Sequence, residues 1–267
     1  MITSKDITNS LYELGLRAGD TCLFHSSFKS LGEVDGGAGA VIKGFEDLLG
    51  ENGTLAVPTL VSKDFFESYN NWHLDKPSET GYLTEYFRKC EGVLRSDQAT
   101  HSVVARGRLA YELTYEHTAR GPHLCPFGEY AFADSSPWLK LYNMNANIVF
   151  IGVTLKYNTL KHPVEARFAE TLLSYVSDPV KKEQLKARLQ SFENRWQGVW
   201  PYYHGEKMQA HLESLGLVSS TQCGNATLRM IKAKDESDAA FKEISENYTE
   251  WYQGEILDWI LECISYK

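Results

Sequence analysis

The sequence predicts an α/β fold, and three observations carry that prediction. A strand, helix, strand order fits residues 21–60, an apolar run typical of a buried strand covers residues 147–153, and a charged amphipathic helix follows residue 178. The 267 residues, 43% of them hydrophobic, are enough for one substantial core, and no repeat or linker divides them. We therefore expect one domain over residues 1–267, with residues 178–267 as either a subdomain or a set of helices packed on the core.

The N-terminal elements follow from local signals. A helix is expected over residues 6–14, ended by Gly15, and "TCLF" at residues 21–24 is typical of a short buried strand between turns. The strand "GTLAVPTL" follows at residues 53–60, which favours a parallel strand pair. The helix between these strands has one apolar stripe at helical spacing, formed by Val41, Ile42, Phe45, Leu48 and Leu49.

The rest of the chain alternates loops with short helices. Residues 62–80 are polar and aromatic without either period, so we expect a long surface loop of a length that is often functional. Short helices are expected at residues 83–90, 109–117 and 136–142, before the strand "NIVFIGV" at residues 147–153. A charged amphipathic helix is then predicted for the segment "PVKKEQLKARLQSFENRW", and the C-terminal segment from Asp235 is rich in acidic and aromatic residues.

Composition and charge exclude several classes of function. No apolar run approaches the roughly 20 residues that span a bilayer, and "MITSKDITNS" lacks the features of a signal peptide, so we expect a cytoplasmic protein without a membrane partner. Five scattered cysteines without C-x-x-C predict neither disulfides nor a thiolate zinc site. A net charge of -8 argues against nucleic-acid binding, which depends on Lys and Arg, and favours a cationic partner.

A glycine-rich loop, "HSSFKSLGEVDGGAGA", follows the first strand. A junction of this kind presents free main-chain N–H groups and the positive end of a helix dipole, which suits a phosphate or another polar group. The spacing matches neither nucleotide fingerprint, because Ile42 stands where G-x-G-x-x-G needs its third glycine and no G-K-[ST] follows. A flexible turn is the alternative, and Ser26 and Ser27 are equally well explained as turn residues.

Two histidine segments, "THS" at residues 100–102 and "TLKHPVEAR" at residues 159–167, are candidates for acid–base chemistry. His162 and Glu165 would share a helical face, and Pro163 indicates either a helix start or a tight loop. A His oriented by a carboxylate suits a general base, with a structural hydrogen-bonded pair as the alternative. Zinc is weakly supported, because the chain has no H-E-x-x-H and no evident third ligand, so we predict no metal.

Taken in order, these segments resemble the aminoglycoside 3-N-acetyltransferase family, also called the antibiotic N-acetyltransferase family. The resemblance covers about residues 15–169, in the motifs "HSSFKSLGEVDGGAGAVIKGFEDLLGENGTLAVPTL", "TGYLTEYFRKCEGVLRS", "THSVVARG", "PFG", "SPWLKLY", "IVFIGV" and "NTLKHPVEA". It implies a single α/β unit with a central mixed sheet flanked by helices, distinct from the GNAT acetyltransferases, with a helical C-terminal region that shapes the acceptor site. It also implies an N-acetyltransferase that uses acetyl-CoA.

The resemblance further implies roles for individual residues. The family motif T-x-x-H-x-x-E falls on Thr159, His162 and Glu165. His162 would take a proton from the amine as it attacks the thioester, Glu165 would orient the ring, and Thr159 would stabilise the oxyanion, with no covalent enzyme intermediate. Residues that would contact coenzyme A near its pantetheine or phosphates are His25, Ser26, Ser27 and Lys29, and those that would hold the pantetheine arm are Ser102, Val103 and Ala105.

The acceptor is expected to be an aminoglycoside or a related amino sugar, and the alternative is a nucleotide-linked amino sugar in polysaccharide or natural-product biosynthesis. The chain departs from the family at Gln98 and Ala99, where His-Pro is common, and at Pro163, where Leu is usual. Acidic residues that would receive a polycation, or simply form a solvated surface, are Asp64, Glu67, Asp75, Glu79, Glu129 and Asp134. Aromatic residues that would stack on a sugar or nucleotide, or only pack the loop, are Phe65, Phe66, Tyr69 and Trp72.

Two other classes of function agree less well with the sequence. A binding protein that keeps the coenzyme pocket without turnover is disfavoured by the intact Thr159, His162 and Glu165. A cysteine-nucleophile acyltransferase would need a Cys near His and Asp, for which the chain gives no motif. The expected partners are therefore acetyl-CoA and a small-molecule amine, and a homodimer is compatible with the sequence but not required by it.

Overall fold

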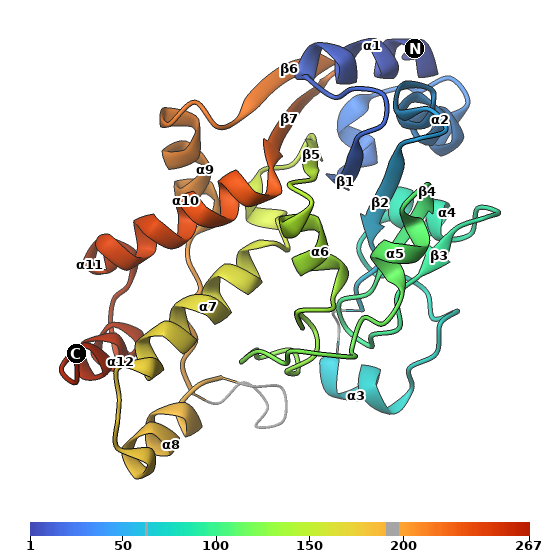
Figure 1. The fold of residues 1–267 in the computed structure, drawn as a ribbon. Coiled ribbons are helices and arrows are strands. Elements are labelled where there is room, and N and C mark those ends of the chain that lie inside the picture. Colours follow the sequence, from blue (N-terminus) through green and yellow to red (C-terminus); the bar gives the residue numbers. More distant parts are fainter. Residues whose placement is uncertain (62–63, 191–197) are drawn as a thin grey trace.

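A mixed seven-stranded sheet in the order β3-β4-β2-β1-β5-β7-β6 forms the centre of the protein. The computed structural model describes residues 1–61, 64–190 and 198–267. Figure 1 shows helices covering both faces of the sheet. The strands are β1 (Thr21–Ser26), β2 (Thr54–Pro58), β3 (Leu94–Arg95), β4 (Val103–Gly107), β5 (Asn147–Ile151), β6 (Ser219–Cys223) and β7 (Ala226–Lys232).

The helices vary from one turn to about four turns in length. The α-helices are α1 (Ser4–Leu14), α2 (Gly37–Leu49), α3 (Phe65–Asn70), α4 (Tyr82–Arg88), α5 (Ala110–Thr114), α6 (Pro137–Asn143), α7 (Lys161–Ser174), α8 (Pro179–Ala187), α9 (Gly205–Ser214), α10 (Ala233–Glu246), α11 (Tyr248–Trp251) and α12 (Glu255–Ile264). Two short 3₁₀ helices are η1 (Phe28–Leu31) and η2 (Leu155–Tyr157). None of these helices is long and apolar enough to cross a membrane.

The opening strand, helix, strand unit has the parallel pairing that its order predicts. β1 runs parallel to β2, with Thr21 opposite Thr54, and also parallel to β5. Helix α2 connects β1 to β2, and its Phe45 ring stacks on Phe24 of β1 with ring centroids 4.9 Å apart. Alternate residues of β1 therefore enter different cores: Phe24 packs under α1 and α2, and Leu23 packs on the opposite face of the sheet.

Several elements were not predicted. Helix α3 lies inside the expected loop of residues 62–80, and β3 and β4 fall between predicted helices. In the C-terminal region, β6 and β7 form an antiparallel pair, and β7 extends the sheet beside β5 with Lys232 opposite Asn147. Helix α8 ends at Ala187, and residues 191–196 of the longer helix that we expected lie outside the described residues.

Helix α7 begins at the segment that carries the candidate base. Pro163 is in the first turn, where a missing N–H breaks no hydrogen bond of the helix, so the helix-start alternative is confirmed. The N–H of His162 donates to the carbonyl of Thr159 at 3.1 Å, which closes the turn into the helix. Figure 1 shows α7 running alongside α10, so the C-terminal region covers the helix that bears His162.

Candidate active site

His162 and the buried Glu165 form a hydrogen-bonded pair in the first turns of α7. His162 Nδ1 lies 2.8 Å from Glu165 Oε2, as their spacing in the sequence predicts. The His162 side chain is 13% exposed and that of Glu165 is fully buried. No described residue makes a hydrogen bond to His162 Nε2. The second ring nitrogen is therefore available to a ligand.

Burial controls the protonation of this pair. It lowers the pKa of His162 well below its ordinary value of 6.5, and the positive charge of Lys161 acts in the same direction. Burial also raises the pKa of Glu165 to about 8, against the opposing effects of Lys161 and of the indole of Trp200. Trp200 Nε1 donates to Glu165 Oε2 at 3.3 Å, and Glu165 Oε1 has no partner among the described residues. A neutral imidazole is the form that can accept a proton.

Aromatic rings surround the His162 imidazole. Phe127 and Tyr202 lie edge-on at centroid distances of 4.8 Å and 6.0 Å, and Phe132 is tilted at 5.6 Å. His101, from the "THS" segment, lies 5.9 Å from His162 in an edge-on arrangement. The structure therefore brings the two candidate histidine segments together, within walls that limit the access of water.

The side chain of Gln98 holds the "THS" segment through hydrogen bonds to its main chain. Its side-chain oxygen accepts the N–H groups of Thr100 and His101, and its nitrogen donates to Tyr69 at 2.7 Å. The hydroxyl of Tyr69 in turn donates to the carbonyl of Phe127 at 2.8 Å. The residue that departs from the family pattern thus makes structural contacts of its own.

The loop that leads into α7 is held by a residue that the sequence did not suggest. Asn158 donates through Nδ2 to Glu236 Oε1 on α10, and its Oδ1 accepts the N–H of Leu160 at 3.1 Å. Both Asn158 and Glu236 are buried, and burial raises the pKa of Glu236 to about 8. Thr159 is buried within this loop. Helix α10 therefore sets the position of the first turn of α7.

The predicted coenzyme loop begins at the carboxyl ends of the parallel strands β1 and β5. His25 is buried against Phe150 at a centroid distance of 5.4 Å, and its Nε2 has no partner among the described residues. Burial lowers the pKa of His25 to about 3. Ser26 ends β1, the N–H of Ser27 donates to the carbonyl of Ile151 at 2.8 Å, and Lys29 is exposed on η1.

Three other predicted coenzyme contacts lie at the start of β4 and within it. Ser102 is buried, and its hydroxyl donates to the carbonyl of Thr59 at 2.9 Å and accepts from Arg95 Nε at 3.1 Å. Val103 and Ala105 are fully buried, and β4 is paired on both sides, with β2 and β3. The main chain of these two residues is therefore largely committed to the sheet.

Some of the loop residues that were predicted to contact an acceptor make contacts within the protein instead. Asp64 caps α3 by accepting the N–H of Glu67 at 2.9 Å, and Asp134 pairs with His123 at 2.9 Å. The ring of Phe65 stacks on His101 at a centroid distance of 5.8 Å. For Phe65 and Asp64, the structure therefore assigns packing and capping contacts.

Cysteine and metal chemistry have little support at this site. Burial raises the pKa of Cys125, near Glu165 and Glu170, so its thiol stays protonated. Within residues 1–61, 64–190 and 198–267, no three side chains of His, Cys, Asp or Glu are arranged to hold a metal ion. The acid–base pair of His162 and Glu165 is the chemistry that the described residues present.

Comparison with known proteins gives the same family as the motifs. The family model described as aminoglycoside 3-N-acetyltransferase matches residues 23–245. The aminoglycoside N(3')-acetyltransferase-like protein YokD of Bacillus subtilis is 26% identical over 247 residues, which cover 83% of this chain and 86% of that protein. Aminoglycoside N(3)-acetyltransferase VII of Streptomyces paromomycinus is 30% identical over 183 residues, 62% of this chain, and the match spans 60% of that enzyme.

Solved structures of related enzymes share the fold. The crystal structure of Bacillus subtilis YokD has a TM-score of 0.67 at 23% identity and covers 92% of this chain and 100% of that one. The binary complex of AAC-IIIb with CoASH has a TM-score of 0.67 at 17% identity and covers 95% of this chain and 98% of the other. A histidine-to-alanine mutant of AAC(3)-IVa, solved in complex with a gentamicin, has a TM-score of 0.68 at 16% identity, with coverage of 96% and 93%.

These structures confirm the predicted fold class, a central mixed sheet flanked by helices of the antibiotic N-acetyltransferase type rather than the GNAT type. The family model extends over most of the chain, from β1 to the end of α10. The chain belongs to the aminoglycoside 3-N-acetyltransferase family, a family of acyltransferases.

Proposed function

We propose that the chain transfers the acetyl group of acetyl-CoA to an amine of an aminoglycoside or related amino sugar. The observation that carries the proposal is the buried His162 imidazole, with Nδ1 bound to Glu165 and Nε2 left for a ligand. The relative from Streptomyces paromomycinus, named as an aminoglycoside N(3)-acetyltransferase, supports the acceptor class. The CoASH complex of AAC-IIIb supports the acyl donor.

In this mechanism, His162 is the general base. Its Nε2 accepts a proton from the amine while the amine nitrogen bonds to the thioester carbonyl carbon. In its carboxylate form, which its pKa of about 8 favours at higher pH, Glu165 Oε2 accepts the Nδ1–H; this fixes the tautomer with Nε2 unprotonated and stabilises the imidazolium that forms. The C–S bond then breaks, and His162 returns the proton to the thiolate, so that the products are an amide and a thiol and no bond to the protein forms.

Other residues of the site have supporting roles in the proposal. The hydroxyl of Thr159 would donate to the oxyanion of the tetrahedral intermediate. Phe127 and Phe132 limit water around the imidazole, which strengthens each electrostatic contact there. Trp200 and Glu236 come from beyond residue 178, so we propose that residues 1–267 act as one domain and that the C-terminal region completes the site.

The residues around the His25 loop fit the chemistry of coenzyme A. The unpartnered Nε2 of buried His25 needs a hydrogen-bond partner. Helix α2 begins without a side-chain cap, and although the N–H of Gly37 donates to the carbonyl of Val34, the next N–H groups of its first turn would be open to a phosphate. Ser26, Ser27 and Lys29 would supply hydroxyl groups and a positive charge. Near the "THS" segment, Ser102 would approach the pantetheine arm, with Val103 and Ala105 as the apolar wall behind it.

A thiol-release assay with acetyl-CoA tests the proposal. The panel contains aminoglycosides and amino-sugar nucleotides, and calorimetry measures acetyl-CoA binding in parallel. Turnover with aminoglycosides supports the proposal as stated, whereas turnover with amino-sugar nucleotides alone changes the acceptor to the nucleotide-linked class. Acetyl-CoA binding without any turnover would remove the acceptor class, and the absence of both would overturn the whole proposal.

A further inference from the structure

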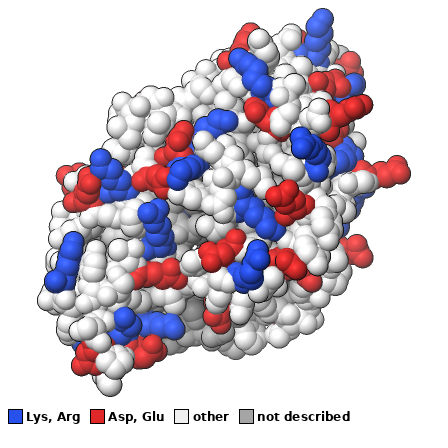
Figure 2. All heavy atoms as spheres, in the orientation of Figure 1, with Lys and Arg blue, Asp and Glu red and all other residues white. Residues whose placement is uncertain are grey.

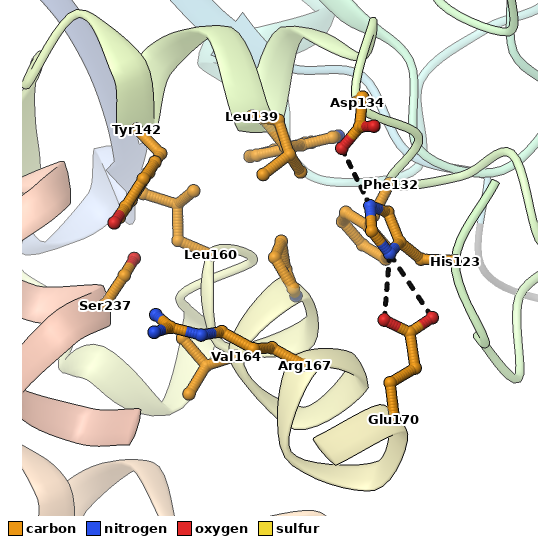
Figure 3. Close-up of a pocket in the computed structure, with 12 residues that line it drawn as sticks. His123, Phe132, Asp134, Leu139, Tyr142, Leu160, Val164, Arg167, Glu170 and Ser237 are labelled. Carbon is orange, nitrogen blue, oxygen red and sulfur yellow. Dashed lines mark hydrogen bonds and ion pairs between the residues drawn. The ribbon is translucent and has the colours of Figure 1, made fainter. Parts of the chain in front are cut away.

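A cavity beside the proposed active site has Phe132 and Pro163 in its wall. Its volume is about 240 Å³, and α6, α7, α10 and residues 123–134 contribute its walls (Figure 3). The residues that line it are His123, Phe132, Asp134, Trp138, Leu139, Tyr142, Leu160, Pro163, Val164, Arg167, Glu170 and Ser237. His162 is not among them, although Pro163 follows it directly and the Phe132 ring lies 5.6 Å from its imidazole. The cavity therefore adjoins the proposed active site without including the His162 imidazole.

The charged groups at the rim are already paired with one another. His123 Nδ1 lies 3.0 Å from Glu170 and its Nε2 lies 2.9 Å from Asp134, as the dashed lines in Figure 3 mark. The hydrogen bond to Glu170 raises the pKa of His123 to about 9, so one imidazolium faces the two carboxylates and offsets one of their two charges. This side of the rim therefore keeps a single unbalanced negative charge, which is little with which to hold a polycation.

The cation on the opposite side of the rim is also paired. Arg167 Nη1 lies 3.3 Å from Asp238, and its guanidinium lies over the Phe241 ring at 3.9 Å. Tyr142 donates its hydroxyl to the same Asp238 at 2.8 Å. On the face seen in Figure 2, Lys and Arg side chains are likewise interspersed with Asp and Glu. An anion would find no free positive group among the described residues of this rim.

One polar group in the cavity has no partner. Ser237, on α10, is 6% exposed and lines the cavity, and its hydroxyl makes no hydrogen bond to any described residue. Figure 3 shows this hydroxyl directed along the cavity wall towards the Tyr142 side. This hydroxyl is not among the buried atoms that lack a partner, so it is open to the cavity, and a polar ligand atom can replace the water that it would otherwise bind.

We propose that this cavity binds an uncharged, ring-sized ligand that carries one polar atom for the Ser237 hydroxyl. Apolar cavities of about 150 Å³ are known to hold a benzene ring, so 240 Å³ accommodates one ring with a substituent. The aromatic walls, Phe132 and Trp138, suit ring contacts. Such a ring comes either from a free small molecule or from an uncharged part of the acetyl acceptor.

Phenol, with toluene as its partner that lacks the hydroxyl, is the probe for the test. Binding to the full chain is measured by ligand-observed NMR without acetyl-CoA, so the result does not depend on the proposed function. Phenol is expected to bind with a dissociation constant of order 1 mM, as befits a ligand of its size. Ser237→Ala should weaken phenol about 5-fold and leave toluene unchanged, because only phenol loses a hydrogen bond.

A second experiment fills the cavity with a larger side chain. Leu139→Trp adds side-chain volume at the cavity wall and should weaken the binding of both probes at least 10-fold. The matched control is Leu215→Trp, at a 52% exposed position at the end of α9, which should leave the binding of both probes unchanged. Competition of phenol with the acceptor in the thiol-release assay identifies the ring as part of the acceptor, and a change in turnover without competition identifies a free ligand. Equal phenol binding by Leu139→Trp and Leu215→Trp, or no saturable phenol binding to the wild type, overturns the proposal.

Discussion

Trp200 and His162 bind the same oxygen atom of Glu165. His162 Nδ1 lies 2.8 Å and Trp200 Nε1 lies 3.3 Å from Oε2. Two contacts on one oxygen restrain the carboxyl group, so the partner of the His162 ring is held from α7 and from the segment after residue 198. This arrangement makes Glu165 and Trp200 the residues whose loss should reduce turnover without affecting binding.

Glu165→Gln is expected to lower kcat about 10-fold to 100-fold. The amide keeps the shape of the side chain but cannot form the carboxylate that stabilises the imidazolium as the proton moves. The measurement is kcat in the thiol-release assay, with Glu183→Gln on the exposed face of α8 as the control. A Glu165→Gln enzyme as fast as the control would remove Glu165 from the mechanism.

Trp200→Phe is expected to lower kcat about 3-fold to 10-fold and leave the KM for acetyl-CoA unchanged. Phenylalanine fills most of the indole volume but cannot donate to Glu165 Oε2, so only the orientation of the carboxyl group changes. Trp251→Phe is the matched control, because Trp251 Nε1 donates to a different carboxylate, Glu243, at 3.0 Å. Equal kcat values for the two variants would contradict the positioning role.

The two histidines near Phe132 should titrate in opposite directions from the ordinary value. Burial lowers the pKa of His162 well below 6.5, so its ring stays neutral as the pH falls through 6.5, whereas Glu165, whose pKa burial raises to about 8, takes up its proton before that pH is reached. The hydrogen bond to Glu170 raises the pKa of His123 to about 9, so this ring stays charged at neutral pH and loses its proton only near pH 9. NMR titration of the imidazole nitrogens measures both, with each signal assigned by substitution. A His162 ring that is protonated at pH 7 would contradict the base assignment.

Glu236→Leu is expected to lower kcat about 10-fold and the free energy of unfolding by about 1–3 kcal/mol, because Asn158 loses its buried acceptor. Glu236→Gln retains an oxygen for Asn158 and should stay within about 3-fold of the wild type in kcat. Chemical denaturation and the thiol-release assay provide the two readouts. Similar losses in both variants would show that the charge or acidity of Glu236, and not its contact with Asn158, matters.

The sequence predicted elements whose pattern is local. β1, α2 and β2 carry an apolar stripe and turn residues within a short span, and the parallel pairing follows from their order. β6 and β7 were not predicted, because most residues of β6 are exposed and its pairing with β7 supplies the strand structure. Helix α3 is only one to two turns long and is capped by Asp64, a signal too short to distinguish from a loop.

The candidate site likewise has contacts that the sequence could predict and contacts that it could not. His162 and Glu165 are three residues apart, so their contact could be predicted from helical geometry. Trp200 and Glu236 reach the site only through the packing of the C-terminal region, and nothing in their local sequence indicates a partner 35 or 78 residues away. Helical geometry by itself brings residues three apart onto one face, whereas these contacts depend on the tertiary arrangement of α7 and α10.

The measurement that tests the central claim most directly is kcat of His162→Ala, with His73→Ala at an exposed position as the control. Removal of the general base should lower kcat by roughly 100-fold or more while acetyl-CoA binding, measured by calorimetry, is retained. Near-wild-type turnover by a folded His162→Ala enzyme would contradict the account.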